Sequence, residues 1–140
     1  MPTETITQAQ QCLDTLRANV DDAFAYLHSF CLQDGRLEPQ LLDQNQKVSY
    51  ELAFCVADLE AAAALLDYAA RIDSEADLCE RIALVFCAEN IRSTWQRLLT
   101  HAQELGLQSS ELLTLMGTEL FSGFLATHGD VEPVSYTHLR

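Results

Sequence analysis

Apolar side chains recur at steps of three and four residues along most of the chain, the spacing of an α-helix that buries one side. Four such runs cover about residues 5–32, 39–71, 75–105 and 109–128, and short segments with Gly, Asp or Ser separate them. The pattern therefore predicts four helices. Their expected core positions are Leu13, Leu16, Val20, Phe24, Leu27 and Cys31, then Leu42, Val48, Leu52, Cys55, Leu59 and Leu66, then Leu78, Ile82, Val85, Trp95, Leu98, Ala102 and Leu105, then Leu112, Leu113, Met116, Leu120, Phe121, Phe124 and Leu125.

The ends of these predicted helices carry local signals. Gly35 suits a left-handed residue after the first helix. Pro39 suits the first turn of the second helix, where its missing N–H is not needed. Ser74 with Asp77 resembles a capping box at the start of the third helix, and Gly106 suits its end.

Short connections place consecutive helices side by side and antiparallel. We therefore expect an all-α fold, an up-down-up-down four-helix bundle with long helices, forming a single domain over residues 1–130. Gly117 and Gly123 weaken the fourth helix, because each costs about 1 kcal/mol relative to alanine in a helix interior.

The second helix has two apolar sides within YELAFCVADLEAAAALLDYAA. On a helical wheel, Glu51 and Asp58 fall on one side and Glu60 and Asp67 on the opposite side, so they separate two apolar faces. One face suits the bundle core and holds Leu52, Cys55, Val56, Leu59, Ala63 and Leu66. The other holds Tyr50, Phe54, Ala57, Ala61, Ala64, Leu65 and Tyr68. Three other helices cannot easily cover both faces, so the second face is predicted to be an interface with a partner subunit, in a homo-oligomer, or with a missing domain.

Composition and charge narrow the partners. The 140 residues are 49% hydrophobic, and the formal net charge is −13 with only eight Lys and Arg residues. This charge disfavours nucleic acid and anionic membrane surfaces, which are bound through Lys and Arg. The N-terminus lacks the features of a secretory signal, and no uncharged run is long enough to span a bilayer. We expect a cytoplasmic protein.

Candidate chemistry is sparse. The five cysteines are odd in number, form no CxxC and lie within apolar helical runs, which favours reduced, mostly buried thiols. No Glu-x-x-His occurs, and His28, His101 and His128 are isolated, so no metal site is expected. A Cys–His nucleophilic site stays open, because spatial adjacency is not visible in a sequence. Trp95 and Phe86 could line a ligand pocket, but aromatic residues at helical spacing favour a core role.

Residues 41–106 resemble the C-terminal helical domain of acyl-CoA dehydrogenases. The resemblance is a pattern of small and apolar residues on two consecutive helices. It consists of Gln46 near a helix start, Leu52-Ala53, Leu59-Glu60-Ala61-Ala62 and Leu65-Leu66, followed by Ala83, Phe86-Cys87-Ala88-Glu89 and Leu105-Gly106. The resemblance implies a helical domain of a larger FAD-dependent flavoprotein. Such an enzyme removes an α-proton from an acyl thioester and passes a β-hydride to the flavin.

Several family motifs have no counterpart in this chain. Gly35-Arg36 is present where the family has an Arg…Phe-Gly segment that contacts flavin, but the Phe-Gly pair is missing. The family's catalytic glutamate segment is also missing, so the resemblance carries over no catalytic residue. Arg36 is its one candidate for cofactor contact, and a solvated loop arginine is the alternative. The isolated 140 residues are predicted to bind no FAD and to be inactive.

The last residues, VSYTHLR, fit no helix. They look like a translated sequencing adapter, so residues 131–140 are predicted to be a disordered, partly non-native tail on a truncated metagenomic reading frame. Three hypotheses follow for the chain: a fragment of an acyl-CoA dehydrogenase-like flavoprotein with a mainly structural and oligomerisation role, a stand-alone acidic interaction module without catalysis, or an unrelated bundle with no ligand.

Overall fold

The computed structural model describes residues 2–129. Most of them lie in helices, which confirms the all-α prediction. The predictions for the tail at 131–140 fall outside the described residues. The elements, in chain order, are α1 (Glu4–Phe30), β1 (Leu32–Gln33), β2 (Arg36–Leu37), α2 (Pro39–Gln44), α3 (Gln46–Arg71), α4 (Ala76–Thr100), α5 (Ser109–Met116) and α6 (Glu119–His128).

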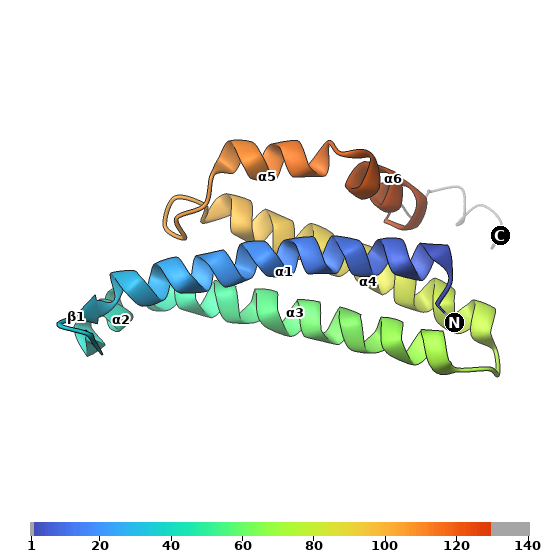
Figure 1. Cartoon of the computed structure of the whole chain (residues 1–140), viewed down its shortest axis with the longest axis horizontal. Helices are drawn as coiled ribbons and strands as arrows, with labels where there is room; N and C mark the ends of the chain where they lie inside the picture. The colour runs from blue at the N-terminus through green and yellow to red at the C-terminus, as the bar shows by residue number, and fades with distance from the viewer. Residues whose placement is uncertain (1, 130–140) are drawn as a thin grey trace, which may run out of the picture.

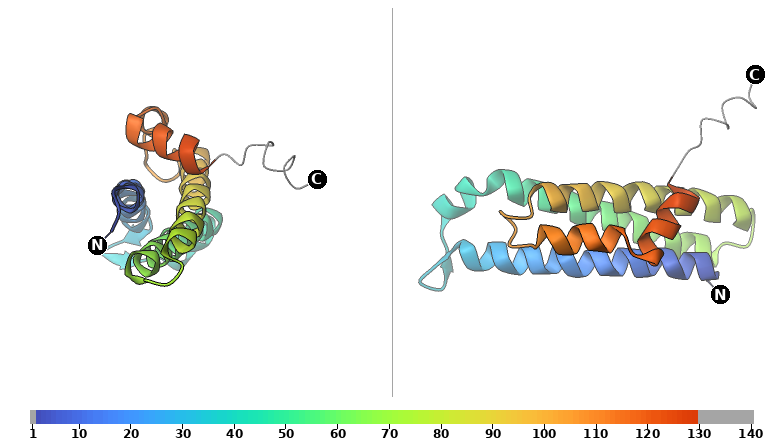
Figure 2. Two further views of the ribbon diagram at one scale, coloured as in Figure 1. Left: turned by 90° about the vertical axis from the view of Figure 1, so that its right-hand side faces the viewer. Right: turned by 90° about the horizontal axis from the view of Figure 1, so that it is seen from above.

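The long helices α1, α3 and α4 pack side by side, and the chain reverses direction from each to the next (Figure 1). The short helices α5 and α6 form a separate layer on α1 and α4, on the side away from α3 (Figures 1 and 2). As a result, α5 and α6 cover one side of α1 and α4. The main neighbours of α3 are α1 and α4 alone.

The core lies between the three long helices and continues under the α5–α6 layer. Its largest fully buried side chains include Leu16, Leu52, Leu59, Ile91 and Phe121, which come from four different helices. Burial of such apolar surface is the dominant favourable term in folding. Most core positions predicted in the first two runs are buried. The predictions for Phe24 and Leu42 are wrong, since both are exposed.

The predicted fourth helix is not continuous. Helix α5 ends at Met116, Thr118 has extended backbone angles (φ −66°, ψ 153°), and α6 begins at Glu119. The Thr118 hydroxyl donates to the carbonyl of Leu115 at 2.7 Å. Gly117 stabilises a helix poorly, and a following threonine suits the position before a new helix, so the break lies where the sequence is weakest as a helix.

The first connection contains a short hairpin that the apolar pattern did not predict. Strands β1 and β2 pair antiparallel, with Gln33 opposite Arg36. Asp34 and Gly35 have φ of 52° and 78°. An Asp-Gly pair favours these left-handed angles in a two-residue hairpin turn. The left-handed conformation predicted for Gly35 is confirmed, but it turns the hairpin and does not end α1.

The second predicted helix is divided at Asn45 into α2 and α3. The Asn45 side-chain amide donates to the carbonyl of Leu41 at 2.8 Å, which holds the bend. Pro39 is in the first turn of α2, as predicted. At the start of α4, Glu75 is left-handed with φ 54° and no side chain caps the helix, so the capping box predicted for Ser74 is wrong.

The first half of α4 is rotated relative to the prediction. Leu78, Ile82 and Val85 were predicted to be core residues, yet they are 53%, 53% and 39% exposed. This half of α4 is apolar on more than one side, and the side that packs inward holds Leu84 with the small side chains of Ala83, Cys87 and Ala88. Small residues let the neighbouring helices approach closely, and the larger aliphatic residues are left at the surface.

Candidate interaction face on alpha3 and alpha4

The six interface residues predicted on the second helix lie on the outer side of α3. Tyr50, Phe54 and Tyr68 are 63%, 39% and 51% exposed. Ala57 and Ala61 are also exposed, and the remaining predicted residue, Leu65, is half-buried. The opposite side of α3 faces the core through Leu52, Cys55, Leu59, Ala62 and Leu66. The helix is therefore two-sided in the structure, and only one of its apolar sides is covered.

Helix α4 packs antiparallel beside α3 and adds exposed apolar side chains of its own (Figure 1). Arg97 near the end of α4 reaches the first half of α3, while the Cys87 thiol lies 3.7 Å from the carbonyl of Ala62. The first turns of α4, with exposed Leu78, Ile82 and Val85, therefore lie along the second half of α3. We call the exposed surface of both helices the α3–α4 face; it comprises Tyr50, Phe54, Ala57, Ala61, Leu65, Tyr68, Leu78, Ile82 and Val85.

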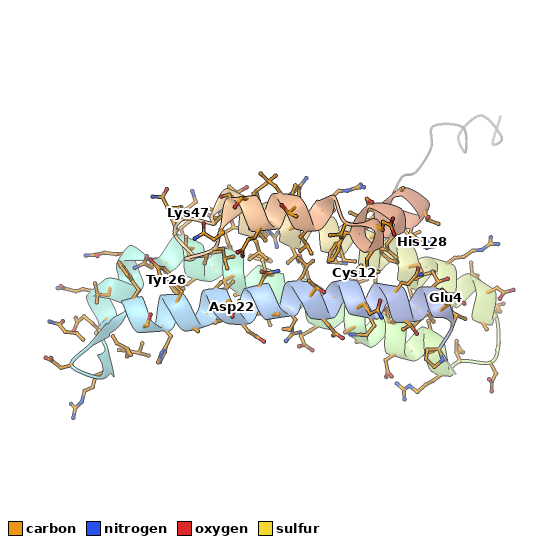
Figure 3. The ribbon with its side chains drawn as sticks, turned by 45° about the horizontal axis from the view of Figure 1, so that its top comes forward. Glu4, Cys12, Asp22, Tyr26, Lys47 and His128 are labelled. Carbon is orange, nitrogen blue, oxygen red and sulfur yellow. The ribbon has the colours of Figure 1, made fainter. Side chains whose placement is uncertain are left out.

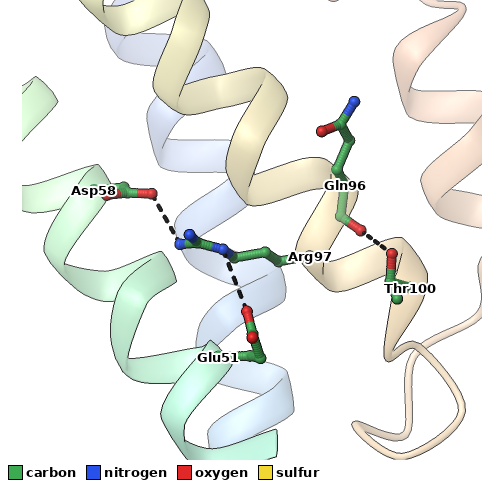
Figure 4. A network of polar contacts seen from close by, with 5 residues as sticks. All are labelled: Glu51, Asp58, Gln96, Arg97 and Thr100. Atoms are coloured by element: carbon green, nitrogen blue, oxygen red, sulfur yellow. Dashed lines mark hydrogen bonds and ion pairs between the residues drawn. The ribbon is translucent and has the colours of Figure 1, made fainter.

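Arg97 of α4 contacts three side chains in the first half of α3. Arg97 Nε lies 3.3 Å from a carboxylate oxygen of Glu51, and Arg97 Nη1 donates to Asp58 Oδ2 at 3.1 Å (Figure 4). The same guanidinium lies 4.9 Å from the centre of the Phe54 ring, in cation–π geometry. Phe54 in turn packs edge-on against Tyr50, with ring centres 4.7 Å apart. The aromatic side chains are thus held in place before any partner binds.

The remaining acidic residues of α3 are also paired. Glu60 forms an ion pair with Arg17 of α1, and Asp67 lies 2.7 Å from Arg71 on the next turn. Every carboxylate along α3 therefore has an arginine partner within the chain. Exposed pairs of this kind add little to stability. Their effect here is a low net charge along α3, where four carboxylates are paired with three arginines, in a protein whose net charge is −13.

Arg36, the residue that the flavoprotein resemblance nominated for cofactor contact, does not belong to this face. It is exposed on β2, in the hairpin at one end of the molecule (Figure 1). The histidines predicted to be isolated do not form a site with Arg36 either. His28 is exposed, and His101 lies 3.4 Å from a carboxylate oxygen of Glu104.

The thiols are poorly suited to nucleophilic chemistry. Burial raises the pKa of Cys12 and of Cys55 to about 11 and that of Cys87 to about 12. For Cys55, nearby Arg97 opposes the rise in pKa, but desolvation is the larger effect. Cys12, labelled in Figure 3, lies on the part of α1 that passes beside α6. Cys31 is buried as well, and Cys79 alone among the five is partly exposed. Nucleophilic catalysis needs a lowered thiol pKa, so these environments disfavour a Cys–His site.

His128, also labelled in Figure 3, packs against Phe124 with ring centres 4.9 Å apart. Burial lowers the pKa of this histidine, and the charge of Glu80 opposes that effect. Within residues 2–129, no three His, Cys, Asp or Glu side chains gather as metal ligands would. Over the same residues, none of the helices combines the length and apolarity needed to cross a bilayer.

Comparison of the chain with protein-family models gives no match, and comparison with curated proteins gives no relative. The acyl-CoA dehydrogenase resemblance therefore rests on the sequence pattern alone. Sequence reasoning selected the α3 part of the candidate face from its helical wheel. It missed the α4 part because Leu78, Ile82 and Val85 also fit a core stripe, and their exposure follows from the rotation of α4.

Proposed function

We propose that this chain is a helical interaction module that acts by docking through the α3–α4 face, without catalysis of its own. The observation that carries the proposal is the row of exposed aromatic and aliphatic side chains along α3, with further exposed aliphatic side chains on α4. Scattered exposed apolar residues are normal, but a contiguous row on a small protein is typical of a protein–protein interface. Exposed aromatic anchors such as Tyr50, Phe54 and Tyr68 are the residue types enriched at such interfaces.

Within this proposal the fold is an up-down-up-down bundle whose fourth element is α5 followed by α6. The three long helices supply a rigid platform, and the ion pairs of Arg97 fix the orientation of α4 against α3. Rigid, preorganised side chains lose less conformational entropy on binding than mobile ones do. The platform therefore favours recognition by shape and apolar contact.

Introduction of a charge on the face tests the proposal. Phe54→Glu and Leu65→Glu introduce a charge into the apolar surface and should weaken association by roughly tenfold or more, because a buried unpaired charge is costly. Leu113→Glu is the matched control, since Leu113 is 55% exposed on α5, outside the face. Light scattering after size exclusion measures association, and circular dichroism checks the helices. Loss of the helical fold in Phe54→Glu would place that side chain in the core and contradict the proposal.

A second candidate function is a helical domain of a larger acyl-CoA dehydrogenase-like flavoprotein that uses FAD. What supports it is the sequence pattern over residues 41–106, most of which forms the α3–α4 hairpin. The isolated chain is expected to be colourless, because the flavin-holding segments of that family have no counterpart in these residues. The coding sequence on either side of this region is the test. Flavin-binding segments there would support the candidate, and a continuous reading frame without them would contradict it.

A further inference from the structure

The α5–α6 layer is attached to the molecule in a different way from the long helices. Helix α5 has 8 residues and α6 has 10, and the break at Gly117 and Thr118 keeps them from forming one longer helix. Isolated helices shorter than about 12–15 residues are marginal in water. Both helices therefore depend on the apolar side chains that they bury against α1 and α4, which are Leu112, Phe121, Phe124 and Leu125.

We propose that the α5–α6 layer is a hinged cover. In this proposal α5 and α6 separate together from α1 and α4 by opening at Gln108, while α1, α3 and α4 stay folded and packed. The open state exposes the apolar surface of α1 and α4 that the layer otherwise covers (Figure 2). The inference goes beyond the proposed function, since it does not depend on docking through the α3–α4 face.

The boundary between the layer and the long helices contains three clefts. One lies beside α5, between Asp22 of α1 and Leu112. A second lies between Gln8 of α1 and Phe124 of α6, and a third lies between α1, the first turns of α4 and His128. Their volumes are about 250, 460 and 340 Å³. Protein interiors have few voids larger than a water molecule, so the layer does not form one continuous core with α1 along these stretches.

The polar contacts between α4 and the layer can be replaced by water. Trp95 Nε1 donates to the carbonyl of Leu112 at 2.8 Å, and Arg92 Nη1 donates to the carbonyl of Gly129, directly after α6, at 3.2 Å. Both hydrogen bonds are only partly buried. A hydrogen bond that is exchanged for bonds to water contributes little net free energy. These contacts therefore orient the layer without preventing its separation.

The connection from α4 ends at a suitable hinge. Ala102 and Leu105 are buried, and the Leu107 N–H donates to the carbonyl of Ala102 at 2.8 Å, so the chain is anchored as far as Leu107. The next residue, Gln108, has extended backbone angles (φ −89°, ψ 114°), and its side chain makes no cap hydrogen bond to α5. A few residues at the end of an element can absorb the backbone rotation of a hinge, and Gln108 is in that position.

The long helices keep their own contacts when the layer leaves. Each of α1, α3 and α4 contacts the other two. Leu52 and Leu59 are buried on α3, whose main neighbours are α1 and α4. Arg17 of α1 and Arg97 of α4 form ion pairs with carboxylates of α3. None of these contacts involves α5 or α6, so all of them are retained in the open state.

Hydrogen exchange of backbone amides under native conditions tests the cover in the full chain. An amide that exchanges through a partial opening reports the free energy of that opening, whereas an amide of the most stable elements reports global unfolding. After correction for intrinsic rates, we expect the amides of α5 and α6 to exchange at least about tenfold faster than the slowest amides of α1, α3 and α4.

Ala62→Gly separates partial opening from global unfolding. Ala62 is buried on α3, so glycine there destabilises the closed and open states equally relative to the unfolded chain. It should speed exchange of the slowest long-helix amides by about fivefold or more and leave α5 and α6 unchanged.

Gly123→Ala is the matched change in the layer. Alanine favours the helical form of α6 and thus stabilises the closed state relative to both the open state and the unfolded chain. It should slow exchange by about fivefold in the layer and in the long helices alike. The contrast between the two variants is the signature of a cover that opens on its own.

Three results would overturn this inference. Equal acceleration of the layer and the long helices in Ala62→Gly would mean that the layer opens only when the whole chain unfolds. Equal protection of the layer and the long helices in the unaltered chain would mean the same. Fast exchange in α6 alone, with α5 as protected as α4, would exclude the hinge at Gln108.

Discussion

The two outer sides of the long-helix layer differ in how their apolar surface is covered. On one side, α5 and α6 bury Leu112, Phe121, Phe124 and Leu125 against α1 and α4. On the other side, α3 presents Tyr50, Phe54 and Tyr68 with no covering helix among the described residues. The difference indicates that the chain supplies its own cover for one apolar surface, and we propose that a partner supplies the other.

Helix α5 is held on α4 by a hydrogen bond as well as by apolar packing. The indole N–H of Trp95 donates to the carbonyl of Leu112 at 2.8 Å, which ties α5 to α4. On the open side, the polar groups are ion pairs within the chain, and the apolar side chains carry no such fixed contact outside α3 and α4. Substitutions on the covered side should therefore change folding stability, and those on the open side should change association.

The largest expected effect contrasts two phenylalanines. Phe121→Ala removes a ring that is 1% exposed and should lower the free energy of unfolding by about 3–5 kcal/mol, because it leaves a cavity in the core. Phe54→Ala should lower the unfolding free energy of the monomer by less than about 1 kcal/mol. Urea unfolding at a concentration low enough to keep the chain monomeric measures both. Equal losses would mean that the α3–α4 face is part of the folding core.

A substitution at Gly106 tests the turn that connects α4 to the α5–α6 layer. Its φ is 68°, and a Cβ at this position would overlap the ring of Tyr26. Gly106→Ala should therefore cost about 2–4 kcal/mol from the left-handed backbone and the displaced ring.

Gly123→Ala is the matched control for Gly106→Ala. A Cβ at Gly123 has no atom within 4 Å, and alanine favours α6 by about 1 kcal/mol. Thermal unfolding compares the two variants. A Gly106→Ala protein as stable as the Gly123→Ala protein would contradict the tight turn.

The buried thiols predict how stability depends on alkaline pH. Burial raises the pKa of Cys12, Cys55 and Cys87 to about 11–12 in the folded chain, from an ordinary value of 9.0. Between these values the unfolded chain loses thiol protons that the folded chain keeps, so unfolding is favoured as the pH rises. The free energy of unfolding should be steady below pH 9 and fall from there toward pH 11.

Chemical denaturation at several pH values measures this dependence. Cys87→Ala should flatten the alkaline decrease, although it lowers stability at neutral pH by opening a cavity. A free energy of unfolding that stays constant from pH 8 to pH 11 would be inconsistent with buried, protonated thiols.

The smallest expected effect is a gain. Thr94 is fully buried on α4, and its hydroxyl has no hydrogen-bond partner among the described residues. Thr94→Val keeps the shape and removes the unpaired polar group, so it should raise the free energy of unfolding by about 1 kcal/mol. Thr100→Val is the control, since the Thr100 hydroxyl is exposed and donates to the carbonyl of Gln96 at 2.7 Å (Figure 4). A loss of stability in Thr94→Val would indicate a partner for this hydroxyl.

The apolar pattern predicted the helices better than it predicted their breaks and rotations. Periodicity located all the helical runs, because one buried side leaves a repeat that does not depend on neighbours. It did not show the separation at Asn45 or at Thr118, which depends on local hydrogen bonds. It also chose the wrong side of the first half of α4, where small and large apolar residues alternate around the helix.

The sequence predicted the α3 part of the candidate face but not the α4 part. On α3, the acidic residues at Glu51, Asp58, Glu60 and Asp67 divide two apolar sides, so the sequence alone separates them. On α4, the charged residues Asp77, Glu80 and Arg81 lie beside Leu78 and Ile82 but do not divide the helix into two apolar sides, and only packing shows which side is outside. The arginine partners could not be predicted, since Arg17 and Arg97 are far from their carboxylates in the sequence.

Sedimentation equilibrium of the unaltered chain and of Phe54→Glu tests the central claim most directly. Measurement at about 0.15 M salt limits repulsion between the acidic chains. We expect the mass of the unaltered chain to rise with concentration to twice the 15.6 kDa of one chain, and Phe54→Glu to stay at the mass of one chain. The same mass for both proteins at every concentration would contradict self-association through the α3–α4 face.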